Sequence, residues 1–276
     1  MPNLLGAAVP VDAGWNFAPI VLVALVAYAA IYTWRWRISR REGGARAAGG
    51  GRLALWLTGV ALLFVALISP VDRLGEQLAT MHMVQHLLLA DLVPICLTLA
   101  LTKHILRPVT RQIHRIERKA GPFGHPAFGV VAYVAAMWVW HIPALYDAAL
   151  ENGFVHVLEH LSFAAAGLLY WWHLLSPIRS RLRLGGIGPV LYMASTKLLV
   201  GFLGILLAFS PEVFYSVYET GGTRWGMSAL DDQHVAGLVM ALEQSIVMGI
   251  ALAWLFARML GESDEEEQRA ERYASP

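Results

Sequence analysis

Apolar residues dominate seven long stretches of this chain, and polar residues gather between them. A helix that crosses a membrane needs roughly 20 mainly apolar residues, and each stretch approaches or exceeds that length. The second stretch stops at Ser69-Pro70, and the fourth runs into Pro143, where we expect a kink or an end of the helix. The predicted spans are 17–38, 53–69, 79–102, 127–146, 154–175, 188–209 and 232–257.

Composition supports a membrane protein rather than a water-soluble one. Of the 276 residues, 57% are hydrophobic and only 15% are charged, whereas soluble domains carry about 25% charged residues. Mean hydropathy is +0.53. The sequence therefore predicts an all-α, polytopic membrane protein with a seven-transmembrane-helix bundle. Residues 1–260 form one transmembrane domain, and 261–276 form an acidic cytoplasmic tail.

The positive charges predict how the bundle is oriented. Lysine and arginine concentrate in cytoplasmic loops of membrane proteins. Here all of them except Arg73, Arg224 and Lys197 lie at the C-terminal end of, or after, the first, third, fifth and seventh spans, which places them on one side. We expect the N-terminus outside the membrane and the C-terminus in the cytoplasm. The loop after the fifth span contributes Arg179, Arg181 and Arg183.

Six of the ten histidines fall at the predicted outer ends of the third, fourth, fifth and seventh spans. Polar side chains at membrane depth are costly and tend to be functional. Two pairs have i, i+4 spacing, which places both imidazoles on one helix face. We predict a metal site centred on these two pairs, with two further histidines as additional or alternative ligands. The pairs are His82/His86 and His156/His160, and the further ligands are His141 and His234.

The neighbours of these histidines bear on which metal binds. Imidazole binds copper, zinc and other transition metals, and a thioether favours cuprous copper. Met83 lies three residues before His86 and can share its helix face. The carboxylates of Glu159 and Asp232 can bind metal directly or orient an imidazole. Copper is the favoured ion and zinc the alternative, and six histidines can serve one ion or two.

Three charged residues lie in the middle of spans three, six and seven. An unpaired charge in hydrocarbon is costly, so we expect Asp91, Lys197 and Glu243 to pair inside the bundle. Such a cluster can fix the register of the helices, or it can relay protons below the histidine layer.

Five segments of the chain form a recognisable combination: Ser69–Asp72, Met81–Leu88, Trp140–Asp147, Glu159–Phe163 and Asp232-Gln233. In these segments the sequence resembles the CtaG-like family of multi-span assembly factors for bacterial heme–copper cytochrome c oxidase. One departure from the family pattern is Ala236-Gly237, where two glycines are expected. The resemblance implies a protein of the bacterial inner membrane that helps to mature the oxidase and handles copper for one of its copper centres. It also implies oxidase subunits and a periplasmic copper donor as partners.

Two other functions fit parts of the sequence. Residues 156–160 match H-x-x-E-H, in which two histidines bind zinc and the glutamate activates water, so an intramembrane zinc hydrolase is the alternative. Paired histidines on facing helices can also ligate a b-type heme. Membrane lipid is an expected contact, and no basic domain for nucleic acid is present.

Overall fold

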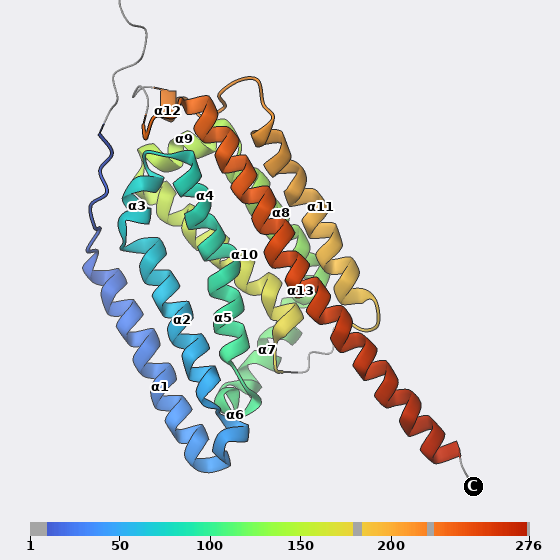
Figure 1. Cartoon of the computed structure of the whole chain (residues 1–276). Coiled ribbons are helices and arrows are strands. Elements are labelled where there is room, and N and C mark those ends of the chain that lie inside the picture. The colour runs from blue at the N-terminus through green and yellow to red at the C-terminus, as the bar shows by residue number, and fades with distance from the viewer. Residues whose placement is uncertain (1–9, 179–183, 220–223, 275–276) are drawn as a thin grey trace, which may run out of the picture.

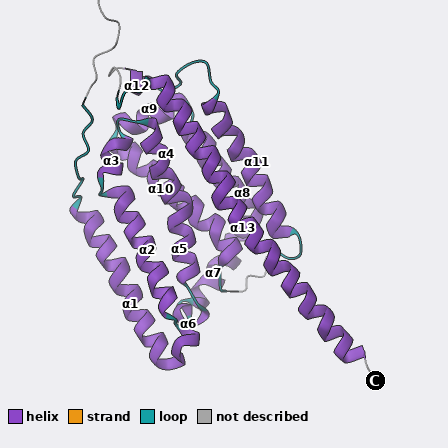
Figure 2. Ribbon diagram, viewed as in Figure 1, coloured by secondary structure: helices purple, strands orange, loops and turns teal. Residues whose placement is uncertain are grey.

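The computed structural model describes residues 10–178, 184–219 and 224–274, and it is helical throughout those ranges except for connecting loops (Figures 1 and 2). Within these ranges, six helical segments are long and apolar enough to cross a membrane. They are α1 (Pro19–Ala47), α2 (Gly50–Leu67), the continuous segment α4 (Ala79–Leu87), η1 (Leu88–Leu92) and α5 (Val93–Ala100), α10 (Gly153–Leu175), α11 (Gly188–Ala208) and the first part of α13 (Ala229–Ala274). The chain is therefore a multi-pass membrane protein.

The seventh candidate span is broken. Helix α7 (Thr110–Ala120) with the 3₁₀ turn η2 (Gly121–Gly124) meets α8 (Pro126–Trp140) at a bend of 66°, and together they pass the length requirement. The fourth predicted span, 127–146, differs from this arrangement. Helix α8 ends at Trp140, and Pro143 begins a separate helix α9 (Pro143–Glu151), since proline is well tolerated at the first helical position.

Four short helices lie at the two ends of the bundle. Helices α3 (Pro70–Gly75), α9 and α12 (Ser216–Glu219) gather at one end, which we call the α9 end. Helix α6 (Lys103–Leu106) lies at the opposite end beside the C-terminus of α1 (Figure 1). The predicted tail, 261–276, continues α13 as helix as far as Ala274. Arg179, Arg181 and Arg183 lie outside the described residues.

Apolar side chains cover the outside of the bundle as well as its core. Ile20, Leu198 and Phe209 are each more than 70% exposed, which is the arrangement expected where lipid is the solvent. Inside, large side chains such as Tyr133, Phe163 and Trp171 are fully buried between α8, α10 and the segment from α4 to α5.

Small residues allow two close helix crossings. A Cβ on Gly237 of α13 would collide with the backbone of α11 at Gly204 and Ala208. A Cβ on Gly167 of α10 would collide with the carbonyl of Ala90 in η1. The second crossing holds α10 against the π-helical η1, directly beside the paired histidines.

Candidate metal centre

Helices α4 and α10 bring four imidazoles together. The rings of His82 and His86 are 4.1 Å apart on α4, and those of His156 and His160 are 4.1 Å apart on α10. Across the helix interface, His82 lies 6.1 Å from His156, and His86 lies 6.1 Å from His160, measured between ring centroids. The two i, i+4 pairs therefore face each other.

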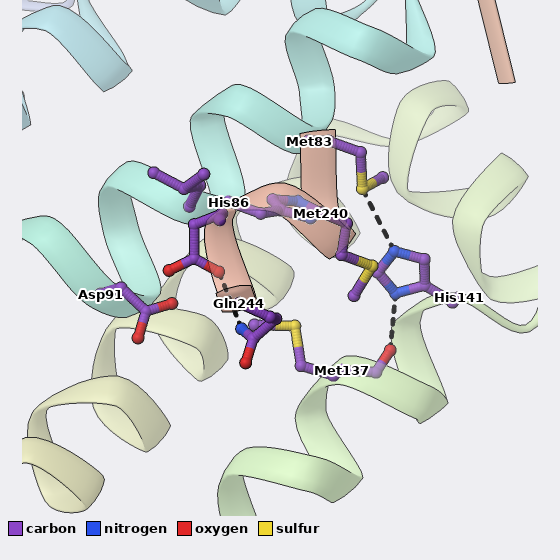
Figure 3. A pocket seen from close by; sticks show the side chains of 9 residues that line it. Met83, His86, Asp91, Met137, His141, Met240 and Gln244 are labelled. Carbon is purple, nitrogen blue, oxygen red and sulfur yellow. Dashed lines mark hydrogen bonds between the residues drawn. The ribbon is translucent and has the colours of Figure 1, made fainter. Parts of the chain in front are cut away.

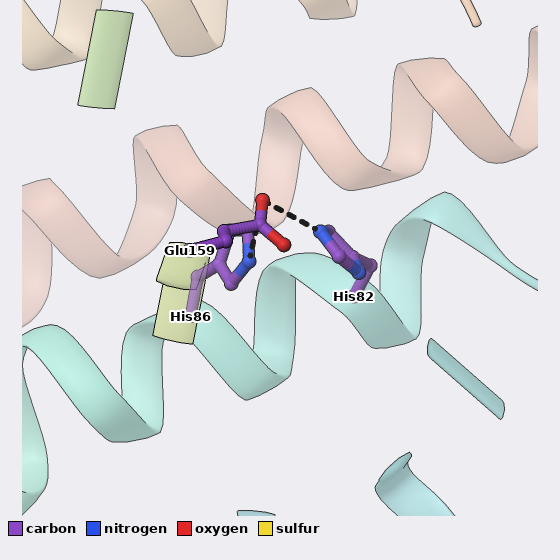
Figure 4. A group of neighbouring side chains, drawn as sticks. All are labelled: His82, His86 and Glu159. Carbon is purple, nitrogen blue, oxygen red and sulfur yellow. Dashed lines mark hydrogen bonds and ion pairs between the residues drawn. The ribbon is translucent and has the colours of Figure 1, made fainter. Parts of the chain in front are cut away.

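Glu159 occupies the centre of this group. Its Oε1 lies 3.4 Å from Nε2 of His82 and 3.4 Å from Nε2 of His86 (Figure 4). The ligand atoms of His82, His86 and Glu159 all lie within 4.8 Å of one another, and so do those of His156, Glu159 and His160. Two potential three-ligand sites thus share one carboxylate. We call these five residues the His/Glu cluster.

The donor atoms of the His/Glu cluster are largely without hydrogen-bond partners. Buried polar atoms in proteins are nearly always hydrogen-bonded, yet Glu159 is fully buried with one free oxygen. The contact between His86 and Glu159 also lacks hydrogen-bond geometry. A bound transition metal would satisfy these atoms, and imidazole nitrogens with a carboxylate suit copper or zinc. The unpartnered atoms are Nδ1 of His82, both ring nitrogens of His86, Nε2 of His156 and His160, and Oε2 of Glu159.

Three tyrosines close the His/Glu cluster at the α9 end. The ring of Tyr146 lies 4.8 Å from that of His82 and stacks on Tyr215 at 3.7 Å. The hydroxyl groups of Tyr146 and Tyr218 are 3.1 Å apart, and Tyr218 donates a hydrogen bond to the carbonyl of Gly75. Burial raises the pKa of Tyr146 and Tyr218 well above the usual value, so both hydroxyls stay neutral. No sequence pattern predicted this cover, although Tyr146 lies in the segment Trp140–Asp147 that carries the resemblance.

The less buried part of the cluster, on α10, faces the outer surface of the bundle between its two ends. His156 and His160 are only partly buried, and His160 lines a largely apolar groove of about 600 Å³. The groove also includes Ile20 of α1, Val157 of α10 and Leu97 of α5. The side facing the lipid is therefore more open than the α9 end.

Two of the six predicted histidines lie outside the cluster. His141 directs Nε2 toward Sδ of Met83 at 3.3 Å, and its ring is 6.2 Å from that of His86. His234 has Nε2 2.8 Å from the carbonyl oxygen of Ser210, to which it donates a hydrogen bond. Met83, expected to share a helix face with His86, lines the same cavity as His86, and its Sδ contacts His141.

Asp232 contacts backbone rather than imidazole. Its carboxylate accepts hydrogen bonds from the backbone N–H groups of Ala79 at 2.6 Å and Thr80 at 3.1 Å. These are the first residues of α4, whose unpaired N–H groups favour a negative charge. Asp232 of α13 therefore anchors the helix that carries His82 and His86.

Of the three charges expected to pair in mid-membrane, two line one small cavity. Asp91 accepts hydrogen bonds from Tyr133 at 2.5 Å and from Trp171 at 2.8 Å. Glu243 lines the same cavity and accepts a hydrogen bond from Gln244. Lys197 makes no ion pair within 4.0 Å in the described ranges. Neutral side chains donate hydrogen bonds to Asp91 and Glu243 in place of the expected lysine. The spacing of residues along the chain could not reveal these donors.

Comparison with known proteins identifies the family. Uncharacterized proteins of Mycobacterium bovis and Mycobacterium tuberculosis are each 26% identical over 240 residues, covering 81% of this chain and 36% of their own length. One from Mycobacterium leprae is 20% identical over 281 residues, covering 94% of this chain and 41% of its own. The chain thus spans about two fifths or less of these relatives. No solved structure matches. Residues 30–262 match the family model described as cytochrome c oxidase caa3 assembly factor, and the chain belongs to this family.

Proposed function

We propose that this protein binds copper at the His/Glu cluster and aids its delivery to a bacterial heme–copper cytochrome c oxidase. Membership of the assembly-factor family supports the oxidase as the destination. The observation that supports metal binding is the set of buried imidazole nitrogens without hydrogen-bond partners around Glu159. Copper is cargo in this proposal, received from a periplasmic donor and passed to an oxidase subunit. The positive-inside pattern supports placing the α9 end at the periplasmic surface.

The arrangement of the ligands fits a carrier. A carrier must release its ion to a partner, so its ligands have to be exchangeable. The cluster divides its ligands between two helices, and its more exposed pair, His156 and His160, lies at the edge of the bundle. We propose that a partner protein exchanges copper with this pair by direct ligand exchange, because the three tyrosines close the opposite approach and a free ion would not cross the apolar groove.

Copper binding and oxidase maturation test the proposal together. The full chain is purified in detergent, stripped with a chelator, reloaded and analysed for metal. The variant His82→Gln/His160→Gln should lose most bound copper, and cells that carry it should accumulate oxidase deficient in copper. His114→Gln/His125→Gln is the matched control, since both residues lie outside the cluster. Retained copper with normal oxidase maturation in the first variant would refute the proposal.

A zinc hydrolase is the second candidate because His156, Glu159 and His160 lie close enough to share an ion. In such enzymes the glutamate stands off the metal to activate water. Here Oε1 of Glu159 lies 3.4 Å from His82 and His86, which favours a ligand or bridging role. Cleavage of an ester, amide or peptide that Glu159→Gln abolishes would favour the hydrolase.

The same glutamate argues against heme. A bis-histidine heme needs a slot for the porphyrin between two imidazoles. Glu159 fills the space between α4 and α10 where that slot would lie. A Soret band in the purified protein would contradict this.

A further inference from the structure

A second group of soft ligands lies beside the His/Glu cluster. A cavity of about 20 Å³ is lined by side chains of α4, η1, α8 and α13 and by His141 (Figure 3). About 10–15 Å³ is enough for one water-sized occupant. Three methionines, Met83, Met137 and Met240, line the cavity together with His86 and His141. The cavity can therefore hold one small occupant in contact with several thioethers.

The hydrogen bonding of His141 leaves one ring nitrogen free for a metal. Nδ1 lies 2.6 Å from the carbonyl oxygen of Met137, so it carries the proton and donates it there. In the neutral imidazole, Nε2 then presents a lone pair. Metal-ligating histidines commonly donate their other N–H to a backbone carbonyl in this way. The backbone of α8 thus fixes the tautomer that a metal needs.

The lone pair on Nε2 of His141 faces a sulfur atom that carries no proton. Sδ of Met83 lies 3.3 Å from Nε2 of His141, and both side chains are buried. A thioether has no hydrogen to donate, so two lone-pair atoms face each other in a dry interior. A protonated imidazole would resolve the contact only by burying another charge, which is costly. A soft cation in the cavity would satisfy both atoms.

The cavity wall also carries a compensating negative charge. Asp91 and Glu243 both line it, and Asp91 accepts one hydrogen bond at each oxygen, from Tyr133 and Trp171. A carboxyl group that accepts at both oxygens is favoured in its ionised form, whereas two neighbouring buried carboxyl groups disfavour ionisation of both. The thioethers and the imidazole are neutral, so a carboxyl pair that shares one proton can balance one monovalent cation.

We propose that this cavity is a Cu(I) site whose ligands are Sδ of Met83, Sδ of Met240 and Nε2 of His141. Thioethers select Cu(I), whereas zinc prefers imidazole and carboxylate. Figure 3 shows Met83 and Met240 beside His141 on the wall of the cavity. The binding site is inferred independently of the His/Glu cluster, and only its use in copper delivery rests on the proposed function.

His86 connects the two groups. It contacts Glu159 at 3.4 Å and lines the cavity that contains Met83 and His141. An ion in the His/Glu cluster and an ion in the thioether site would thus share this imidazole as a neighbour. The proposal adds a Cu(I) position on the thioether side, while the His/Glu cluster, with its imidazole and carboxylate ligands, holds copper in the proposed function and can accept Zn(II) as well.

The test uses Ag(I), a redox-inert monovalent ion of similar softness, and Zn(II) on the same full-length protein in detergent. All variants carry Cys96→Ser, because the free thiol of Cys96 would bind Ag(I). Met83→Leu/Met240→Leu keeps volume and apolarity. The control is Met193→Leu, a buried methionine on α11 that does not line the cavity.

We expect the parent and the Met193→Leu control to bind Ag(I) at least tenfold more tightly than Met83→Leu/Met240→Leu. Zn(II) binding should be equal in all three, which also shows that the double variant is folded. Unchanged Ag(I) affinity in the double variant would overturn the thioether site. X-ray absorption of the Cu(I)-loaded parent supplies a second readout, since a ligand shell without sulfur would also overturn it. Loss of Zn(II) from histidine variants alone tests the His/Glu cluster, so the two proposals can fail separately.

Discussion

Oε1 of Glu159 lies 3.4 Å from Nε2 of His82, and neither side chain is exposed at all. The carboxylate belongs to α10 and the imidazole to α4, so the contact joins the two helices at the metal centre. Glu159 also belongs to both three-ligand groups. It is therefore the residue on which the whole His/Glu cluster depends.

Glu159→Gln should weaken copper binding while the protein stays folded. The amide keeps the shape of the side chain but loses the charge that balances a metal cation. We expect the Kd for copper to rise by about 10- to 100-fold, the range seen when groups that tune a metal site are altered. Competition with a chelator measures it, and Glu117→Gln on α7 is the control. An unchanged Kd would show that Glu159 does not contact the ion.

The shared carboxylate leads us to expect two metal positions. One is formed by His82, His86 and Glu159, and the other by His156, Glu159 and His160. Zn(II) should bind at up to two equivalents per chain, measured by elemental analysis after dialysis. His82→Gln/His86→Gln and His156→Gln/His160→Gln should each keep one equivalent. A single equivalent lost equally in both variants would instead indicate one site with four imidazoles.

The helical architecture could be predicted from the sequence because hydropathy reports burial in lipid directly. The two histidine pairs could be predicted as well, since i, i+4 spacing fixes which side chains share a face. What the spacing could not show is how two faces meet. Met137 lies four residues before His141 in the same predicted span, but Met83 and Met240 lie in two other spans, so no spacing along the chain links them to His141. Their convergence depends on how α4, α8 and α13 pack.

Local irregularities of the backbone could not be predicted from the sequence either. The π-helical segment η1 at Leu88–Leu92 places Asp91 against Tyr133 and Trp171, and no residue pattern marks such a segment. Pro143 did signal a break near the end of the fourth span, but the extent of α9 did not follow from it. Likewise, Asp232 lies near the histidines in the sequence, which suggested a contact with the metal or with an imidazole. In the structure its carboxylate accepts hydrogen bonds from the first N–H groups of α4 and caps that helix.

Asp232→Ala should destabilise the protein chiefly through α4. Removing an N-terminal capping side chain costs roughly 0.5–2 kcal/mol, because backbone N–H groups lose their acceptor. We expect a lower thermal unfolding midpoint and a modest loss of metal affinity, since α4 carries His82 and His86. Circular dichroism and metal titration on the same sample measure both. A large loss of metal with no change in unfolding would indicate that Asp232 is a ligand after all.

Gly167→Ala should be more damaging than its small size suggests. The added methyl group would collide with the carbonyl of Ala90, and backbone of η1 cannot move aside as a flexible side chain can. Overpacking of this kind costs typically about 1–3 kcal/mol. Because the crossing sets the distance between α4 and α10, metal affinity should fall together with thermal stability.

Gly201→Ala is the matched control for that substitution. Gly201 lies within α11 and has nothing within 4 Å of an added Cβ. Alanine is favoured over glycine in a helix by up to about 1 kcal/mol, so stability should stay level or rise. Equal behaviour of the two variants would show that the contact between α10 and η1 does not position the metal ligands. A selective loss of metal binding in Gly167→Ala would instead tie the His/Glu cluster to the spacing of these two helices.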